Sequence, residues 1–175
     1  MLTELKYLRA YPADLQAQVQ RLLSAQGLAD SLQRRYPAAH AVRSDRALYQ
    51  YVGELKSEFL RNAPAVDRVL FDSKIHVIQH ALGLHTTYAR VQGQRLKSSH
   101  EIRIATLFKD SPPEFLRMIA VHELAHLKER QHDKAFYQLC IHMEPDYHQL
   151  EFDVRLYLTH LDHGGTRLWT ASAQA

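Results

Sequence analysis

The chain has 175 residues, of which 46% are hydrophobic and 23% are charged, a composition that excludes a wholly disordered or collagen-like protein. The net charge of +3 is too small to indicate nucleic-acid binding by itself. A single cysteine, Cys140, excludes an intramolecular disulfide and a zinc site built from several thiolates. Twelve histidines are the unusual feature, and they direct attention to metal binding or proton transfer.

The N-terminal third of the sequence predicts helices. Apolar residues recur at helical spacing between 13 and 26, and a shorter helix is expected over 29–35. Ser44 is placed to cap a longer helix over 45–61. Charges recur along the first residues and no apolar run is long enough to span a membrane, so we expect a cytoplasmic protein with no membrane partner.

The middle third changes to strand patterns. Residues 69–71 and 85–91 are rich in β-branched and aromatic side chains, and a turn is expected at 93–94. Apolar and polar residues alternate over 101–108, which predicts the clearest strand. With a short helix or turn near 75–82, this region predicts a small antiparallel sheet.

The last third returns to helical patterns. Ser111 and the two prolines after it predict the start of a helix that continues to about Arg130. Two further helices are expected, one over 134–143 with Asp133 as its cap and one over 147–161.

The order of these elements predicts the fold class and the domain organisation. Helices at both ends and strands in the middle indicate an α+β protein. We expect an N-terminal helical extension over 1–62, a compact core over 63–165 and a flexible tail over 166–175.

The motif that carries chemistry is His122-Glu123-Leu124-Ala125-His126. Two histidines four positions apart lie on one face of a helix, so both imidazoles can bind the same zinc ion. Glu123 is rotated away from that face and can reach a water molecule bound to the metal, as a general base must. Apolar residues surround the motif, which predicts a buried helix rather than a charged surface turn.

A catalytic zinc needs a third protein ligand and an open position for water. We predict His132, which is separated from His126 by five residues, with the helix continuing past Glu129 before the chain reverses. Glu151, on the last predicted helix, is the alternative ligand, and Glu144 is a weaker one.

Four residues after the motif are candidates for supporting roles. Tyr147 or His148 can donate a hydrogen bond to an oxyanion, although packing at a helix start is the more ordinary role. A ligand histidine also needs an acceptor for its free ring N–H, and Asp146 and Glu151 are the candidates.

The segment Met118–Tyr147 resembles the YgjP-like metallopeptidase family, whose members are zincins related to the SprT-like and WLM groups. The matching parts are HELAHL at 122–127, His132 with the DKAF that follows it, and PDY at 145–147. The resemblance implies a compact α+β zincin-like core, three histidine ligands and a catalytic glutamate. This chain differs from the family pattern at 90–97, where it reads RVQGQRLK.

These observations predict a zinc-dependent hydrolase with one zinc per chain, held by His122, His126 and His132, and with Glu123 as the general base. The favoured activity is that of a peptidase acting on a peptide or unfolded protein, docked along an edge strand at 101–108. One alternative is hydrolysis of a non-peptide bond in a nucleotide, for which no Gly-rich phosphate loop is evident. The other is a metal-bearing module that binds protein, with nucleic acid a less favoured partner.

Overall fold

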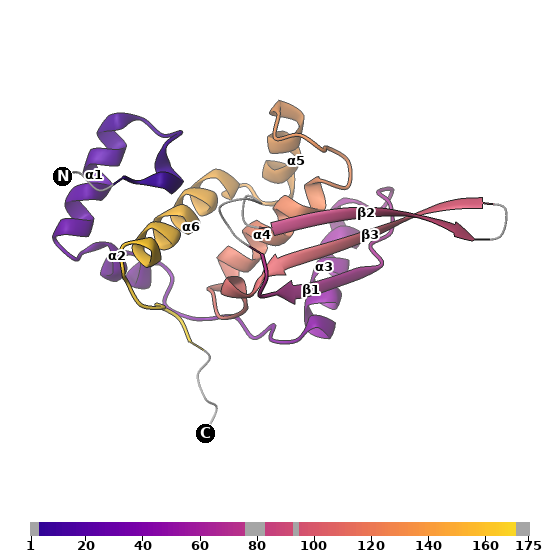
Figure 1. Ribbon diagram of the computed structural model, residues 1–175, viewed down its shortest axis with the longest axis horizontal. Helices are drawn as coiled ribbons and strands as arrows, with labels where there is room; N and C mark the ends of the chain where they lie inside the picture. Colours follow the sequence, from indigo (N-terminus) through magenta and orange to yellow (C-terminus); the bar gives the residue numbers. More distant parts are fainter. Residues whose placement is uncertain (1–3, 76–82, 93–94, 171–175) are drawn as a thin grey trace, which may run out of the picture.

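The structure is a computed structural model that describes residues 4–75, 83–92 and 95–170. Helices occupy both ends of the chain and strands the middle, which confirms the predicted α+β class (Figure 1). In chain order, the elements are η1 (Lys6–Leu8), α1 (Ala13–Ser24), α2 (Leu28–Arg35), α3 (Asp45–Phe59), β1 (Arg68–Asp72), β2 (Gly83–Gln92), β3 (Arg95–Ala105), η2 (Thr106–Lys109), α4 (Pro113–Ala125), α5 (Lys134–Met143) and α6 (Tyr147–Asp162).

Two of the three predicted helix caps are confirmed. The hydroxyl of Ser44 accepts a hydrogen bond from the amide of Ala47 at 3.1 Å, and the carboxylate of Asp133 accepts one from Phe136 at 3.0 Å. Ser111 is different, because its buried hydroxyl donates to the carbonyl of Phe108 at 3.0 Å and so does not cap α4. The side chain stabilises the turn between η2 and α4 instead.

The sheet has three strands in the order β1-β3-β2. β2 pairs with β3 in the antiparallel sense, as predicted. β1 pairs with β3 in parallel, from Arg68 opposite Glu101 to Asp72 opposite Ala105. The predicted antiparallel sheet is therefore wrong for this pair, and the sheet is mixed. Alternation of apolar residues identifies a strand, but it carries no information about the direction of the neighbouring strand.

The strand predicted over 101–108 also differs in position. It is the end of β3, which begins at Arg95, and the residues after Ala105 form η2. Because Glu101–Ile104 pair with β1 on one side and with β2 on the other, this part of β3 cannot serve as a docking edge. The turn expected at 93–94 and most of the helix or turn expected at 75–82 lie outside the described residues.

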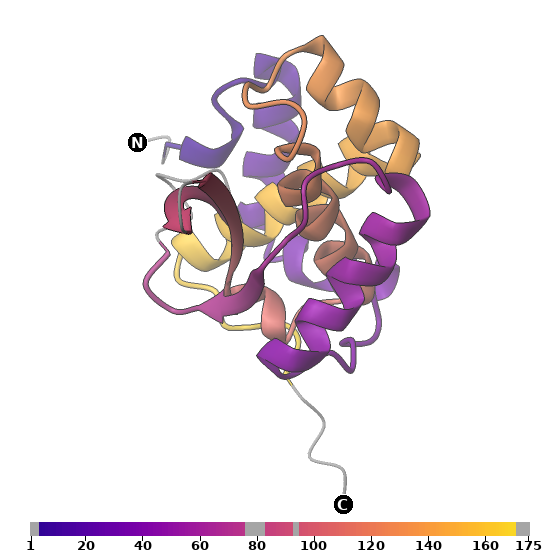
Figure 2. The ribbon, with the colours of Figure 1, turned by 90° about the vertical axis from the view of Figure 1, so that its right-hand side faces the viewer.

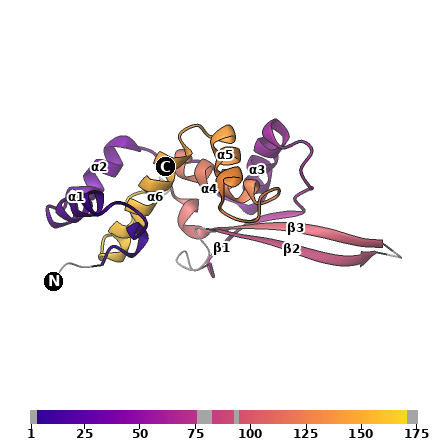
Figure 3. The same ribbon diagram turned by 90° about the horizontal axis from the view of Figure 1, so that it is seen from above.

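The helices around α4 lie on one side of the sheet, as Figures 2 and 3 show for α3 and α5. α3 packs against β1, and α4 contacts both β2 and β3. The far end of the β2–β3 pair extends beyond the helices (Figures 1 and 3). α4 thus lies between the sheet and the remaining helices. No helix in the described part of the chain is long and apolar enough to cross a bilayer.

The N-terminal segment is joined to α6 by a buried carboxylate. Asp153 is fully buried and accepts hydrogen bonds from the guanidinium of Arg35 at 2.9 Å and from the hydroxyl of Tyr36. Trp169 is buried beside it and donates to the carbonyl of Tyr36 at 2.6 Å. The described part of the predicted tail, up to residue 170, therefore packs on the core near Trp169, while the domain boundaries stay a prediction.

Replacement of Asp153 by asparagine should lower the free energy of unfolding by about 2–4 kcal/mol, because the buried hydroxyl of Tyr36 and the guanidinium of Arg35 lose a charged acceptor. Asp162→Asn is the matched control, since Asp162 pairs with Lys6 at the surface and should matter much less. Urea denaturation of the two variants measures the difference. Equal losses would contradict a special role for the buried carboxylate.

Candidate metal centre

Helix α4 carries the HExxH motif through the centre of the protein. Of its thirteen residues, those from Met118 to Ala125 are all buried, including His122 and Glu123, which are 5% and 1% exposed. The predicted burial of the motif helix is therefore confirmed. Apolar residues occupy nearly every face of α4, so few positions around the helix remain where the polar side chains of the motif can meet other polar groups.

Three imidazoles converge at one point at the end of α4. The Nε2 atom of His132 lies 3.2 Å from Nε2 of His122 and 3.1 Å from Nε2 of His126. In the described part of the chain, these three residues form the group of side chains able to hold a metal ion, with ligand atoms within 4.8 Å of one another. The structure thus brings together the three predicted ligands, whose binding of metal stays a prediction.

The spacing of the three nitrogens fits a single small cation. Nitrogens bound to one zinc with tetrahedral geometry lie about 3.3–3.4 Å apart, because each Zn–N bond is about 2.0–2.1 Å long. The observed separations of 3.1 and 3.2 Å are close to that value. Three protein ligands leave a fourth position for water or substrate, the arrangement found in catalytic rather than structural zinc sites.

The other nitrogen of two rings is held by a hydrogen bond. Nδ1 of His126 lies 2.9 Å from the carbonyl oxygen of Glu129, which can only accept, so the proton is on Nδ1 and Nε2 keeps its lone pair. Nδ1 of His122 lies 2.7 Å from the hydroxyl of Tyr147. The contact with Glu129 thus orients Nε2 of His126 toward the cluster.

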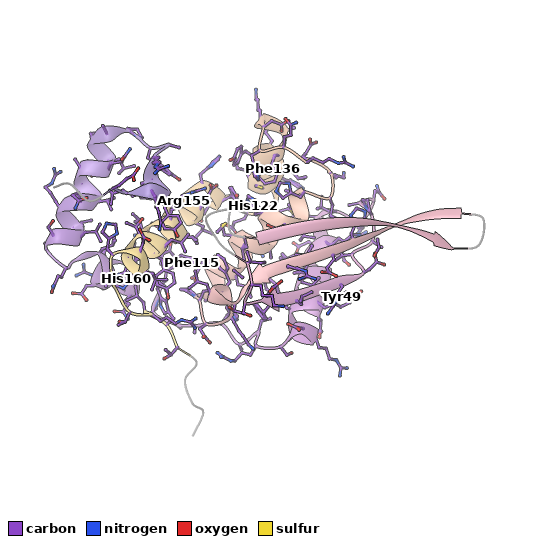
Figure 4. The ribbon with its side chains drawn as sticks, viewed as in Figure 1. Tyr49, Phe115, His122, Phe136, Arg155 and His160 are labelled. Carbon is purple, nitrogen blue, oxygen red and sulfur yellow. The ribbon has the colours of Figure 1, made fainter. Side chains whose placement is uncertain are left out.

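Phe136, the third residue of α5, packs against all three imidazoles, and its label stands close to that of His122 in Figure 4. Its ring centroid lies 4.9, 4.7 and 4.8 Å from those of His122, His126 and His132. The fully buried ring thus limits how far the three imidazoles can turn.

Burial also sets the protonation of the site. It lowers the pKa of His122 well below the ordinary value, and the charges of His126, His132 and Arg155 lower it further. Burial likewise lowers the pKa of His126. Neutral imidazoles are the form that binds metal, so protons compete weakly with a cation at neutral pH.

Burial raises the pKa of Glu123 to about 8. A buried carboxyl group that titrates near neutrality can take a proton and give it back, which is the task of a general base and acid. Glu123 follows His122 directly, so its backbone position is fixed by the same helix turn.

The alternative ligands are occupied elsewhere. The carboxylate of Glu151 accepts a hydrogen bond from Arg155 on its own helix at 3.1 Å, and Glu144 pairs with Arg117. His148 is exposed and packs against Tyr137, with ring centroids 5.3 Å apart. Neither carboxylate belongs to the metal-binding group found among the described residues.

Two details of the sequence prediction are wrong. α4 ends at Ala125 and does not continue past Glu129, because the chain turns at His126 while the amides of Lys128 and Glu129 still bond to the carbonyl of Ala125. The group that meets Nδ1 of His122 is the hydroxyl of Tyr147, not a carboxylate of Asp146 or Glu151.

A sequence signal for the buried position of Tyr147 did exist. The apolar stripe of the last helix, read from Leu150 and Val154, extends back by one helical turn to Tyr147, which is fully buried. The stripe thus predicts that Tyr147 faces the core. It cannot predict which polar group the hydroxyl meets there.

Together the fold and the cluster define an α+β protein with a three-histidine site open to a fourth ligand. The chain belongs to the YgjP-like family, as the resemblance indicated: residues 66–154, about half of its length, match the family described as YgjP-like, metallopeptidase domain. It is also 56% identical over 167 residues to the UTP pyrophosphatase of Escherichia coli strain K12, covering 95% of this chain and 100% of that protein. No solved structure matches the chain.

His132→Ala should weaken metal binding steeply, because two imidazoles four positions apart remain without the third ligand. His142→Ala, which removes an exposed imidazole from α5, is the matched control and should bind zinc as the parent does. Competition with a chromophoric chelator measures both affinities. Equal affinities in the two variants would remove His132 from the ligand set.

Proposed function

We propose that this protein is a zinc-dependent hydrolase that cleaves a phosphoanhydride bond of a nucleoside triphosphate and releases pyrophosphate. The observation that carries the proposal is the convergence of three Nε2 atoms, 3.1 and 3.2 Å apart, beside the buried carboxyl of Glu123. Within this proposal, the core is of the zincin type implied by the HExxH helix.

The residues of the site divide the chemical work. Zinc held by the three imidazoles would polarise the substrate and lower the pKa of the attacking water. Glu123 takes the proton of that water while the oxygen of the water bonds to phosphorus. The bond from phosphorus to the bridging oxygen breaks, and that oxygen leaves with the electron pair as part of pyrophosphate. Glu123 can then release its proton to the leaving group or to solvent.

The choice of a nucleotide substrate is supported by the relative and by local charge. A protein 56% identical over nearly the whole chain is named for hydrolysis of UTP. Lys128, Arg130 and Lys134, in the segment that carries His132, are exposed and can attract a triphosphate. From residue 83 to residue 100 the sequence also contains three basic residues and no acidic one.

A peptidase is the second candidate, since the family is described as having a metallopeptidase domain. The structure keeps one feature that suits a peptide: β2 is an edge strand of the described sheet and contacts α4. An extended chain can pair with such an edge. A binding module without turnover is a weaker alternative, because Glu123 is retained. The proposal also includes a cytoplasmic location.

A direct assay separates the two hydrolases. Zinc-loaded protein is incubated with UTP, with the other nucleoside triphosphates and with a denatured protein substrate. We expect nucleoside monophosphate and pyrophosphate in equal amounts, and intact protein substrate. Cleavage of the denatured protein with UTP left intact would instead establish the peptidase.

Glu123→Gln should retain zinc and lower turnover by about 10²–10⁴-fold, because an amide cannot accept the proton of water. Glu114→Gln, an exposed change in the first turn of the same helix, is the matched control and should leave the rate unchanged. Pyrophosphate release under single-turnover conditions gives both rates. Loss of zinc in Glu123→Gln would make this residue a ligand rather than a base.

A further inference from the structure

One contact of the metal centre is assigned no role by the chemistry described so far. His122 is the most deeply buried of the three imidazoles, and its Nδ1 atom lies 2.7 Å from the hydroxyl oxygen of Tyr147. Tyr147 is the first residue of α6 and is fully buried. An imidazole whose Nδ1 is bonded in this way cannot rotate without breaking a buried hydrogen bond.

We infer that Tyr147 is the positioning residue of the metal centre: its hydroxyl accepts the Nδ1–H of His122 and thereby fixes the tautomer and ring plane that present Nε2 to the cation. The inference rests on the proposed function only in assuming that the three histidines bind metal. Outer partners of this kind typically contribute about 10–100-fold to metal affinity.

The hydroxyl of Tyr147 is able to act as the acceptor. A phenol can accept one hydrogen bond and donate another, so Tyr147 can accept from His122 and keep its own O–H. Burial raises the pKa of Tyr147, and the charge of Glu151 raises it further, so the oxygen stays a neutral hydroxyl. Arg155 donates to the carboxylate of Glu151 at 3.1 Å on the same helix.

The helix that carries Tyr147 is held by the N-terminal segment. Arg155 donates to the carbonyl oxygen of Tyr7 at 3.3 Å, and η1 packs on α6. Both Arg155 and Tyr7 lie outside residues 66–154, the part that matches the family. α6 is therefore anchored in part by residues of this chain that the family match does not cover.

Ring packing holds the hydroxyl of Tyr147 in place. The Tyr147 ring lies 6.4 Å from that of His122 in a nearly parallel arrangement, and 6.2 and 5.7 Å from the rings of Tyr137 and His148. A side chain confined by three rings loses little further freedom when it accepts a hydrogen bond, so the contact is pre-organised.

The test is the zinc affinity of Tyr147→Phe, measured by chelator competition. This variant keeps the ring and removes only the oxygen, so the Nδ1–H of His122 stays buried without an acceptor. We expect the dissociation constant to rise about 10–100-fold. Tyr137→Phe, which removes a phenol oxygen from the adjacent helix, is the matched control and should bind zinc as the parent does.

The outcomes separate the inference from the proposed function. If Tyr147→Phe and Tyr137→Phe bind zinc equally well, Tyr147 has no positioning role. If the parent protein binds no zinc, the proposed function fails and the inference fails with it. Should Tyr147→Phe not fold, as judged by near-ultraviolet circular dichroism of the metal-free protein, NMR of the ring N–H of His122 in the zinc-loaded parent decides. A hydrogen-bonded N–H that exchanges slowly with solvent supports the inference, and a rapidly exchanging one overturns it.

Discussion

Burial of polar groups on α4 is the constraint on which the rest of the structure depends. An imidazole and a carboxyl removed from water lose hydration, and that loss is tolerated only when buried partners replace it. The structure supplies hydrogen-bonding partners for the two imidazoles: the hydroxyl of Tyr147 for His122, and the backbone carbonyl of Glu129 for His126. The same burial lowers the pKa of both imidazoles and raises the pKa of Glu123 to about 8. Burial therefore decides both the arrangement of these side chains and their protonation.

Much of the site could be predicted because it is encoded locally. The HExxH spacing, the position of His132 and the caps at Ser44 and Asp133 depend on residues close together in the sequence, where helix geometry fixes which side chains meet. Tyr147 lies 25 positions from His122 in the sequence, so no helical or strand periodicity predicts that their side chains meet.

The sheet shows the same limit at the level of the fold. The strands themselves were predictable from β-branched and alternating residues, yet the parallel pairing of β1 with β3 depends on how the intervening chain crosses between them. This pairing makes β3 central and moves the free edges to β1 and β2. Whether a strand is central or at an edge depends on the topology of the whole sheet, and the residues of the strand alone do not determine it.

The family description and the name of the relative refer to different bonds, and the metal centre explains how both can hold. A polarising cation with a neighbouring general base activates water equally well for attack on carbon or on phosphorus. What distinguishes the two reactions is the surface that binds the substrate, because a fold and a metal site do not by themselves determine function. Under the proposed function, the exposed cations around His132 would form part of that surface.

The separation in sequence between the motif and its supports has a consequence during synthesis. The ribosome synthesises His122 and His126 before Tyr147, and it synthesises Arg35 118 positions before Asp153. Long-range contacts of this kind form late, because the chain between the two residues must lose conformational entropy before the contact can stabilise the fold. A nascent chain that already contains the whole motif therefore lacks the scaffold that aligns it. Assembly of the three-histidine cluster is therefore completed only after α6 has emerged and docked.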